Sequence, residues 1–214
     1  MQRKYQLLVY GASGFTGRLC AKYLHENYPD LSRAIGGRNK KKLEQLKKEM
    51  NLKCDILIAD AENYEDLANM VKETKVLLTT AGPYAKYGSL LLKACILERT
   101  HYTDITGENH WVKKQMDLYN EEAISKGVRV IPSCGYDSLP SDIGTFFAVN
   151  QMNKSVKKVE VFHSASGGAS GGTIESIFLM GKLPKERRDP FLLNPQETVS
   201  DFQRKNSADS LSIQ

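Results

Sequence analysis

The sequence predicts an α/β protein in which helices cover both faces of a parallel sheet, a doubly wound fold. Short apolar runs alternate with helical patterns up to about residue 150, and each run is bounded by Gly, Asp, Thr or Pro. The first run ends in a glycine-spaced turn that opens a helix. Strands separated by helices of this length imply right-handed crossovers, and therefore a parallel sheet.

The first strand, expected at 5–10, leads through Gly11-x-x-Gly14-x-x-Gly17 into a helix expected at 15–27. The free N–H groups of such a helix N-terminus, with about half a positive charge, receive a pyrophosphate. Gly11 would make the tight turn, Gly14 would let the phosphates approach, and Gly17 would let helix and strand pack closely. The alternative is a tight turn without a ligand. The sequence predicts a Rossmann domain that binds a dinucleotide through Gly11, Ala12, Ser13, Gly14, Phe15, Thr16 and Gly17.

The second strand, 31–36, precedes a helix at 40–50 and ends in Gly36-Gly37-Arg38-Asn39. An acidic residue normally stands at this strand end and binds the ribose 2′-hydroxyl of NAD. None is present here, whereas the Arg38 guanidinium can clamp a 2′-phosphate with two hydrogen bonds. The pattern favours NADP(H) over NAD(H). The alternative is a surface arginine that caps the strand end.

The third and fourth strands, 54–59 and 75–80, precede helices at 63–73 and 87–99. Asp60 is expected either to reach an adenine edge or to cap a turn. The fourth strand is followed by the small or rigid residues Ala81, Gly82 and Pro83, which would let the backbone pass beside the ribose and nicotinamide. The side chain of the next residue, Tyr84, would point into the crevice or lie exposed in a turn.

The last strands, 101–105 and 128–132, flank a helix at 108–126, and a helix at 139–151 follows, with Pro140 in its first turn. The loop at 135–142 is expected to face the same crevice, with Ser138 as the cap of the last helix. Catalytic residues stay unassigned. Tyr84 and Tyr136 are hypotheses for a proton donor, and Asp137 is a third candidate.

Two kinds of site are not expected. No tyrosine has a lysine four positions later, so the Tyr-x-x-x-Lys pair of short-chain dehydrogenases is absent. The four histidines lack metal-ligand spacing, so no metal site is predicted.

The pattern changes after residue 151. Residues 156–163 resemble an amphipathic strand, 166–173 are glycine-rich, and 174–180 have a helical pattern. The remaining apolar residues are too few for an independent core. We predict a dinucleotide-binding domain at 1–151 and the start of a second α/β domain at 152–214. Either the chain is a fragment or another subunit completes this sheet.

Composition indicates a soluble protein with 41% hydrophobic and 26% charged residues and a net charge of +5. The lysines at 40–48 are interleaved with glutamates and lack aromatic neighbours, which favours a solvated helix face over nucleic-acid binding. The four well-separated cysteines indicate free thiols in a reducing, intracellular compartment. No signal peptide or spanning segment is evident, so any membrane contact would be peripheral.

Several segments together resemble the saccharopine dehydrogenase-like oxidoreductases, which include the trans-acting enoyl reductases of bacterial lipid synthesis. They are the glycine turn at 11–17, Gly37-Arg38, and the segments at 81–88, 102–108, 135–142 and 170–173. The resemblance implies a nicotinamide-dependent enzyme with a Rossmann domain and a following α/β domain that often mediates dimerisation. It also implies association with mitochondria, lipid droplets or other membranes in eukaryotic members, and a chain longer than this one.

The expected activity is NADPH-dependent reduction of a C=C or C=N bond in a lipid-like or amino-acid-derived substrate. The alternative is a non-catalytic scaffold or sensor that binds a dinucleotide. Consumption of NADPH with a panel of enoyl-thioesters and imines would separate the two.

Overall fold

The computed structural model of the chain describes residues 3–157, 159–162, 164, 168, 171–182 and 191–194. Its centre is one six-stranded sheet in the order β3-β2-β1-β4-β5-β6, with every neighbouring pair parallel. The strands are β1 (Tyr5–Tyr10), β2 (Arg33–Gly37), β3 (Asp55–Ile58), β4 (Thr74–Thr79), β5 (His101–Asp104) and β6 (Val130–Ile131). The predicted doubly wound fold is confirmed. From β1 the chain adds β2 and β3 on one side of the sheet, and then β4, β5 and β6 on the other side. The switch point between β1 and β4 is the place where open α/β sheets bind ligands.

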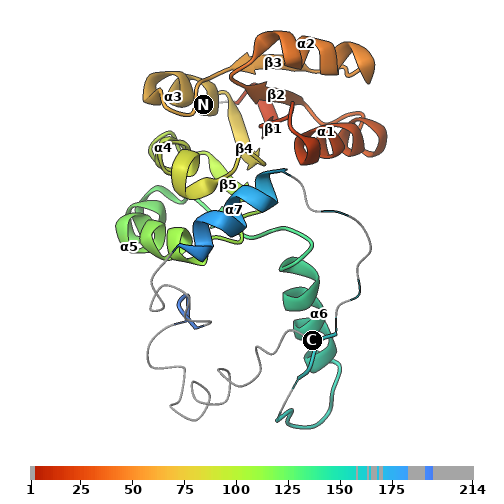
Figure 1. Ribbon diagram of the computed structural model, residues 1–214, viewed down its shortest axis with the longest axis vertical. Helices are drawn as coiled ribbons and strands as arrows, with labels where there is room; N and C mark the ends of the chain where they lie inside the picture. The colour runs from red at the N-terminus through yellow and green to blue at the C-terminus, as the bar shows by residue number, and fades with distance from the viewer. Residues whose placement is uncertain are drawn as a thin grey trace.

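Helices connect the strands and follow the last of them (Figure 1). They are α1 (Phe15–Asn27), α2 (Lys40–Glu49), α3 (Tyr64–Val71), α4 (Tyr84–Leu97), α5 (Asn109–Lys126), α6 (Leu139–Asn150) and α7 (Gly171–Gly181). Side chains set several of their ends. The Asn39 Oδ1 accepts a hydrogen bond from the N–H of Lys42 at the start of α2, and α5 ends at Gly127, whose φ is 67°.

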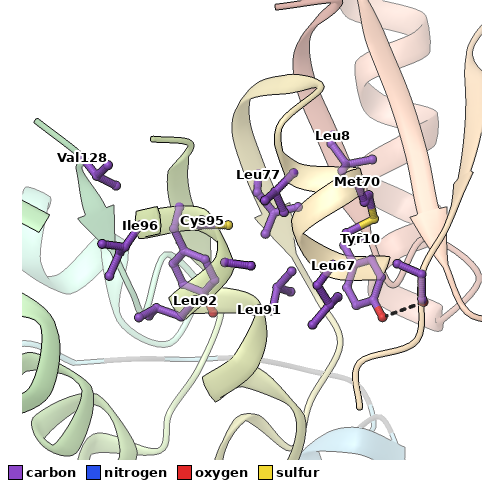
Figure 2. Packing of buried hydrophobic residues seen from close by; sticks show 14 of the residues in the cluster. Leu8, Tyr10, Leu67, Met70, Leu77, Leu91, Leu92, Cys95, Ile96 and Val128 are labelled. Carbon is purple, nitrogen blue, oxygen red and sulfur yellow. Dashed lines mark hydrogen bonds between the residues drawn. The ribbon is translucent and has the colours of Figure 1, made fainter. Parts of the chain in front are cut away.

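The core has two parts because successive strand residues face opposite sides of the sheet. Leu8 and Tyr10 of β1 pack with α3, α4 and α5, whereas Val9 between them packs with α1 and α2. Figure 2 shows the larger cluster, in which Leu67 of α3 and Leu91 of α4 lie near Tyr10. This burial fixes the strand ends and therefore the loops that follow them.

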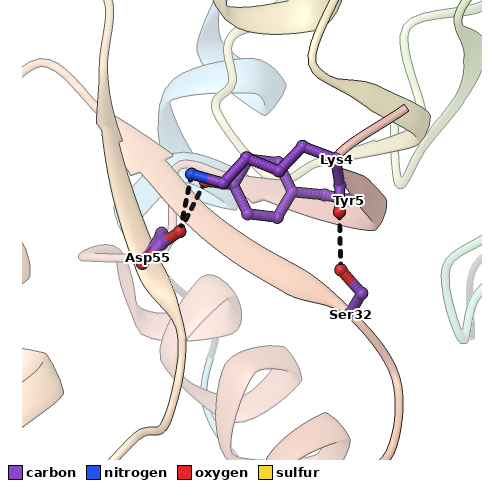
Figure 3. Close-up of polar contacts among 4 residues, drawn as sticks. All are labelled: Lys4, Tyr5, Ser32 and Asp55. Atoms are coloured by element: carbon purple, nitrogen blue, oxygen red, sulfur yellow. Dashed lines mark hydrogen bonds and ion pairs between the residues drawn. The ribbon is translucent and has the colours of Figure 1, made fainter. Parts of the chain in front are cut away.

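A polar cluster joins β1 and β3 at the amino ends of the strands (Figure 3). The Tyr5 hydroxyl donates to Asp55 Oδ2 at 2.6 Å, and Lys4 Nζ lies 3.0 Å from the same oxygen. Ser32 donates from its hydroxyl to the Lys4 carbonyl at 2.7 Å. The cluster lies at the opposite end of β1 from the glycine turn.

The chain after β6 differs from the sequence prediction. α6 has no buried residue, and Phe146 and Phe147 are 69% and 65% exposed. A strand was predicted at 156–163, and this is wrong for the described residues 156, 157 and 159–162, which form no strand. The physical reason is that a strand needs a partner, and β6 pairs with β5 alone among the described strands.

The remaining predictions for this part are only partly tested. The helical pattern at 174–180 is confirmed as part of α7. Residues 166, 167, 169 and 170 of the glycine-rich stretch, and residues 183–190 and 195–214 of the predicted second domain, lie outside the described residues. Within the described part of the chain, no helix is long and apolar enough to cross a membrane.

Candidate functional site

A crevice of about 380 Å³ opens at the carboxyl ends of β1, β2 and β4. Its lining combines the glycine turn, the end of β2, the β4–α4 loop and the first residue of α7. The predicted cofactor residues that line it are Gly11, Ser13, Gly14, Phe15, Thr16, Arg38, Ala81 and Gly82. The crevice lies at the point where the strand order reverses.

The glycine turn has a conformation that only small residues permit. Gly11 has φ 81°, and its N–H donates to the Gly36 carbonyl at 2.9 Å. A Cβ on Gly17 would lie 2.3 Å from the Gly11 carbonyl oxygen, so helix and turn touch directly. Gly14 caps α1 without a side-chain hydrogen bond, and no acidic residue stands in the first turn. The first N–H groups of α1 are thus suited to an anion in the crevice.

Arg38 lines the crevice directly after β2, and its side chain is exposed. None of the ion pairs found among the described residues involves it. The lining contains no Asp or Glu. Asn39 caps the next helix, which leaves the alternative of a surface arginine at the end of β2 untested. The positive charge is available for a ligand.

The structure corrects the placement of Tyr84. It was expected to point into the crevice or to lie exposed in a turn, yet it is 5% exposed and its hydroxyl donates to the Thr79 carbonyl at 3.1 Å. Its ring packs on Trp111 with the centroids 5.7 Å apart. The reason is that α4 begins at Tyr84, three residues earlier than predicted, so Tyr84, Gly88 and Leu91 share one buried face.

Tyr87, and not Tyr84, lines the crevice. It lies one helical turn further along α4. If the predicted helix at 87–99 is extended back by one turn, Tyr84 falls on its buried face. Burial raises the pKa of the Tyr84 phenol well above its usual value, so a deprotonated Tyr84 is excluded near neutral pH.

The remaining candidates lie outside the crevice lining. Asp60 accepts a hydrogen bond from the Glu62 N–H at 3.0 Å, as expected of a turn cap, while its neighbour Ala61 lines the crevice. Ala12 and Gly17 are buried behind the turn, and Pro83 is buried at the start of α4. Tyr136 is 67% exposed and Asp137 is exposed, and neither lines the crevice. Ser138 is the cap of α6, but its side chain makes no capping hydrogen bond.

Two buried carboxylates at the carboxyl ends of the strands had no role in the sequence analysis. Asp104, at the end of β5, accepts hydrogen bonds from the N–H groups of Thr106 and Ser133 at 3.0 and 2.9 Å. Because Ser133 lies directly after β6, its hydrogen bond to Asp104 fixes the loop that follows this strand. Burial raises the pKa of the Asp104 carboxyl above its usual value. Glu108 is 1% exposed and contacts the start of α4.

The described residues hold no group of three or more His, Cys, Asp or Glu side chains that could bind a metal ion. All four cysteines are free. A second cavity, of about 290 Å³, lies between α4, α5 and β6. Its lining is mainly apolar and has no charged side chain, and it contains neither the glycine turn nor Arg38. The first crevice is therefore the candidate cofactor site.

The comparisons with known proteins agree with this geometry. A family model described as the saccharopine dehydrogenase NADP binding domain matches residues 7–131. A lipid droplet localized protein of Caenorhabditis elegans is 33% identical over 190 residues, which cover 82% of this chain and 45% of that protein. A trans-acting enoyl reductase of Mycobacterium ulcerans is 36% identical over 145 residues, which cover 66% of this chain and 35% of that protein.

Among solved structures, an apo saccharopine dehydrogenase (L-Glu forming) from Saccharomyces cerevisiae has a TM-score of 0.58 at 16% identity. The alignment covers 69% of this chain and 31% of that chain. At this identity the likeness shows the fold alone. The chain spans about half the length of the first curated relatives that it matches.

Proposed function

Since the chain belongs to the NADP-binding oxidoreductase family of saccharopine dehydrogenase type, we propose that its crevice binds NADPH in preference to NADH. The observation that carries the proposal is Arg38, an exposed guanidinium in a lining without carboxylates. A carboxylate at the end of β2 would repel a 2′-phosphate, whereas a guanidinium binds it with charge-assisted hydrogen bonds.

The other parts of the crevice fit the rest of the dinucleotide. The N-terminus of α1 would bind the pyrophosphate beside Gly14, and the small residues Ala81 and Gly82 would leave room for the ribose and nicotinamide. Bound nicotinamide supplies a hydride, so the chain's task is to hold the ring against the acceptor carbon and exclude water. Tyr87 replaces Tyr84 as the candidate for a hydroxyl near the reaction.

We propose a lipid-like or amino-acid-derived substrate with a C=C or C=N bond. An enoyl reductase and a lipid droplet localized protein among the relatives support the lipid-like class. Peripheral association with a lipid surface is part of this proposal, and fractionation with lipid droplets tests it. Homodimerisation through residues 152–214 stays a prediction, which the oligomeric state in solution would test.

A second candidate function is a non-catalytic scaffold or sensor. The observation in its favour is that Tyr84, Tyr136 and Asp137, the candidate catalytic residues, all lie outside the crevice lining. NADPH oxidation followed spectroscopically with enoyl-thioesters and imines separates the two functions. Oxidation with one of them supports the enzyme, and tight binding without oxidation across the panel supports the scaffold.

Arg38→Ala tests the cofactor preference. We expect Kd for NADPH to rise roughly ten- to a hundredfold, because charge-assisted hydrogen bonds contribute about 1.5–3 kcal/mol. Kd for NADH should stay within about twofold, since NADH has no 2′-phosphate. Isothermal titration calorimetry measures both. Lys41→Ala, which removes an exposed positive charge from α2 outside the crevice lining, is the matched control. The proposal is wrong if the wild type binds NADH as tightly as NADPH.

A further inference from the structure

Glu108 closes the N-terminus of a helix to which it does not belong. Its Oε1 accepts a hydrogen bond from the Tyr84 N–H at 2.9 Å, and its Oε2 accepts one from the Ala85 N–H at 2.8 Å. These are the first two N–H groups of α4, and Pro83 before them offers no side-chain cap. A buried carboxylate at the positive end of a helix is well stabilised there. Glu108 therefore fixes the point at which the β4–α4 loop, which lines the crevice, becomes helix.

The same carboxylate contacts α7. The Ser176 hydroxyl donates to Glu108 Oε1 at 3.0 Å. Five residues earlier, about 7.5 Å back along the helix, Gly171 lines the crevice together with the glycine turn and Gly82. Figure 1 shows α7 beside the carboxyl ends of the central strands. One carboxylate thus joins two walls of the crevice.

Other described contacts of α7 are weak. The large apolar side chains of α7 that the structure describes, Ile174 and Phe178, are 46% and 69% exposed, so these two are not packed into the core. Glu175 interacts electrostatically with Lys86 of α4, but both side chains are exposed. Such an interaction between exposed charges contributes little to stability. Among the α7 side chains that the structure describes, Ser176 makes a hydrogen bond that ends on a buried group, the Glu108 carboxylate.

We propose that Glu108 is a positioning residue that couples the docking of α7 to occupancy of the crevice. When Ser176 donates to Glu108, Gly171 is held as a wall of the site; when this bond is lost, α7 moves away and the crevice opens on that side. A ligand that contacts this wall stabilises docked α7, and docking of α7 raises the affinity for the ligand by the same factor. The inference rests on the proposed function, because it takes the ligand to be NADPH.

The test compares Ser176→Val with Ser176→Thr in the full chain. Valine and threonine have the same shape and the same β-branch in a helix, and only threonine keeps the hydroxyl. Hydrogen exchange of peptides covering α7 and α4 reports docking, and calorimetry reports Kd for NADPH. Ser125→Ala is a control, since the Ser125 hydroxyl donates only to the Glu122 carbonyl within α5.

We expect Ser176→Val to speed exchange in α7 and leave exchange in α4 unchanged, because Glu108 still caps α4. Kd for NADPH should rise at least about threefold, the worth of one hydrogen bond. Ser176→Thr and Ser125→Ala should behave as the wild type. NADPH should slow exchange in α7 of the wild type and less so in Ser176→Val.

Two results overturn the coupling. One is equal exchange and equal Kd in the valine and threonine variants, and the other is faster exchange in α7 with no change in Kd. Failure of the wild type to bind NADPH is a different outcome, because it refutes the proposed function. Exchange in the ligand-free variants then still decides whether the Ser176–Glu108 bond holds α7.

Discussion

Gly17→Ala should destabilise the fold, whereas Gly14→Ala should affect the ligand more than the fold. A Cβ on Gly17 would lie 2.3 Å from the Gly11 carbonyl oxygen and 2.7 Å from the Ala12 Cα, both of them backbone atoms. Attractive contacts lie near 3.5–4.0 Å, so α1 or the turn must move by about 1 Å. The turn cannot move freely, because the Gly11 N–H donates to the Gly36 carbonyl of β2 at 2.9 Å.

The size of the effect follows from two opposing contributions. Overpacking costs about 1–3 kcal/mol, and the upper end applies where the obstacle is backbone. Replacing a helical glycine by alanine returns up to about 1 kcal/mol. The free energy of unfolding should therefore fall by about 2 kcal/mol, and Tm by roughly 4–8 °C for a chain of this length. Urea denaturation followed by circular dichroism measures the first quantity.

Gly14→Ala is the matched comparison. Its Cβ would meet only the Gly11 oxygen, at 3.3 Å, and its φ of −77° suits alanine. Stability should fall by no more than about 1 kcal/mol, from weaker capping of α1. Kd for NADPH should rise at least about tenfold, because the added methyl group stands where the phosphates would approach. The reasoning is refuted if Gly17→Ala is as stable as the wild type, or if Gly14→Ala is the less stable of the two.

Two further predictions concern carboxylates. Glu108→Gln should lower the free energy of unfolding by about 2–3 kcal/mol in denaturation experiments, because the amide nitrogen cannot accept from both N–H groups at the start of α4, and an unsatisfied buried donor costs about 1–3 kcal/mol; an unchanged free energy would contradict the capping role. The second concerns pH. Hydrogen bonds from Tyr5, and then from Lys4, lower the pKa of the Asp55 carboxyl. Its contribution to stability is therefore present above about pH 3.8, the usual pKa, and is lost as pH falls through the lower folded value. The wild type should lose more stability than Asp55→Asn below pH 4 in acid titrations, by less than about 1 kcal/mol because the pair is exposed. Parallel titration curves would argue against it.

The fold could be predicted because its signals are local. Most strands of the sheet are short apolar runs, and the helices between the strands have their own periodicity, so ends were placed within a few residues. The glycine turn was predicted in detail because close approach and a positive φ both demand glycine there. The strand expected at 156–163 failed because pairing depends on a neighbour, which no local pattern supplies.

The site could be predicted only in part. Gly14 and Arg38 both line the crevice, as their positions after strand ends predicted, and their roles in binding a ligand stay predictions. Tyr84 was predicted to reach the crevice, but Tyr87 lines it, because α4 begins three residues earlier than expected. The ends of helices and strands are the part of a structure that sequence patterns predict least well. The role of Glu108 was missed because its partners are backbone N–H groups 23 and 24 residues earlier in the chain, and backbone groups leave no trace in side-chain patterns.

Because α7 supplies part of the crevice wall, shortening the chain should change the site. A fragment cut after β6 would keep every strand of the sheet, the glycine turn and Arg38, yet it would lack Gly171. Such a truncated module should keep the phosphate-binding turn but admit solvent to the crevice on the side that Gly171 lines. It should therefore bind NADPH more weakly than the full chain, by at least the factor expected for Ser176→Val.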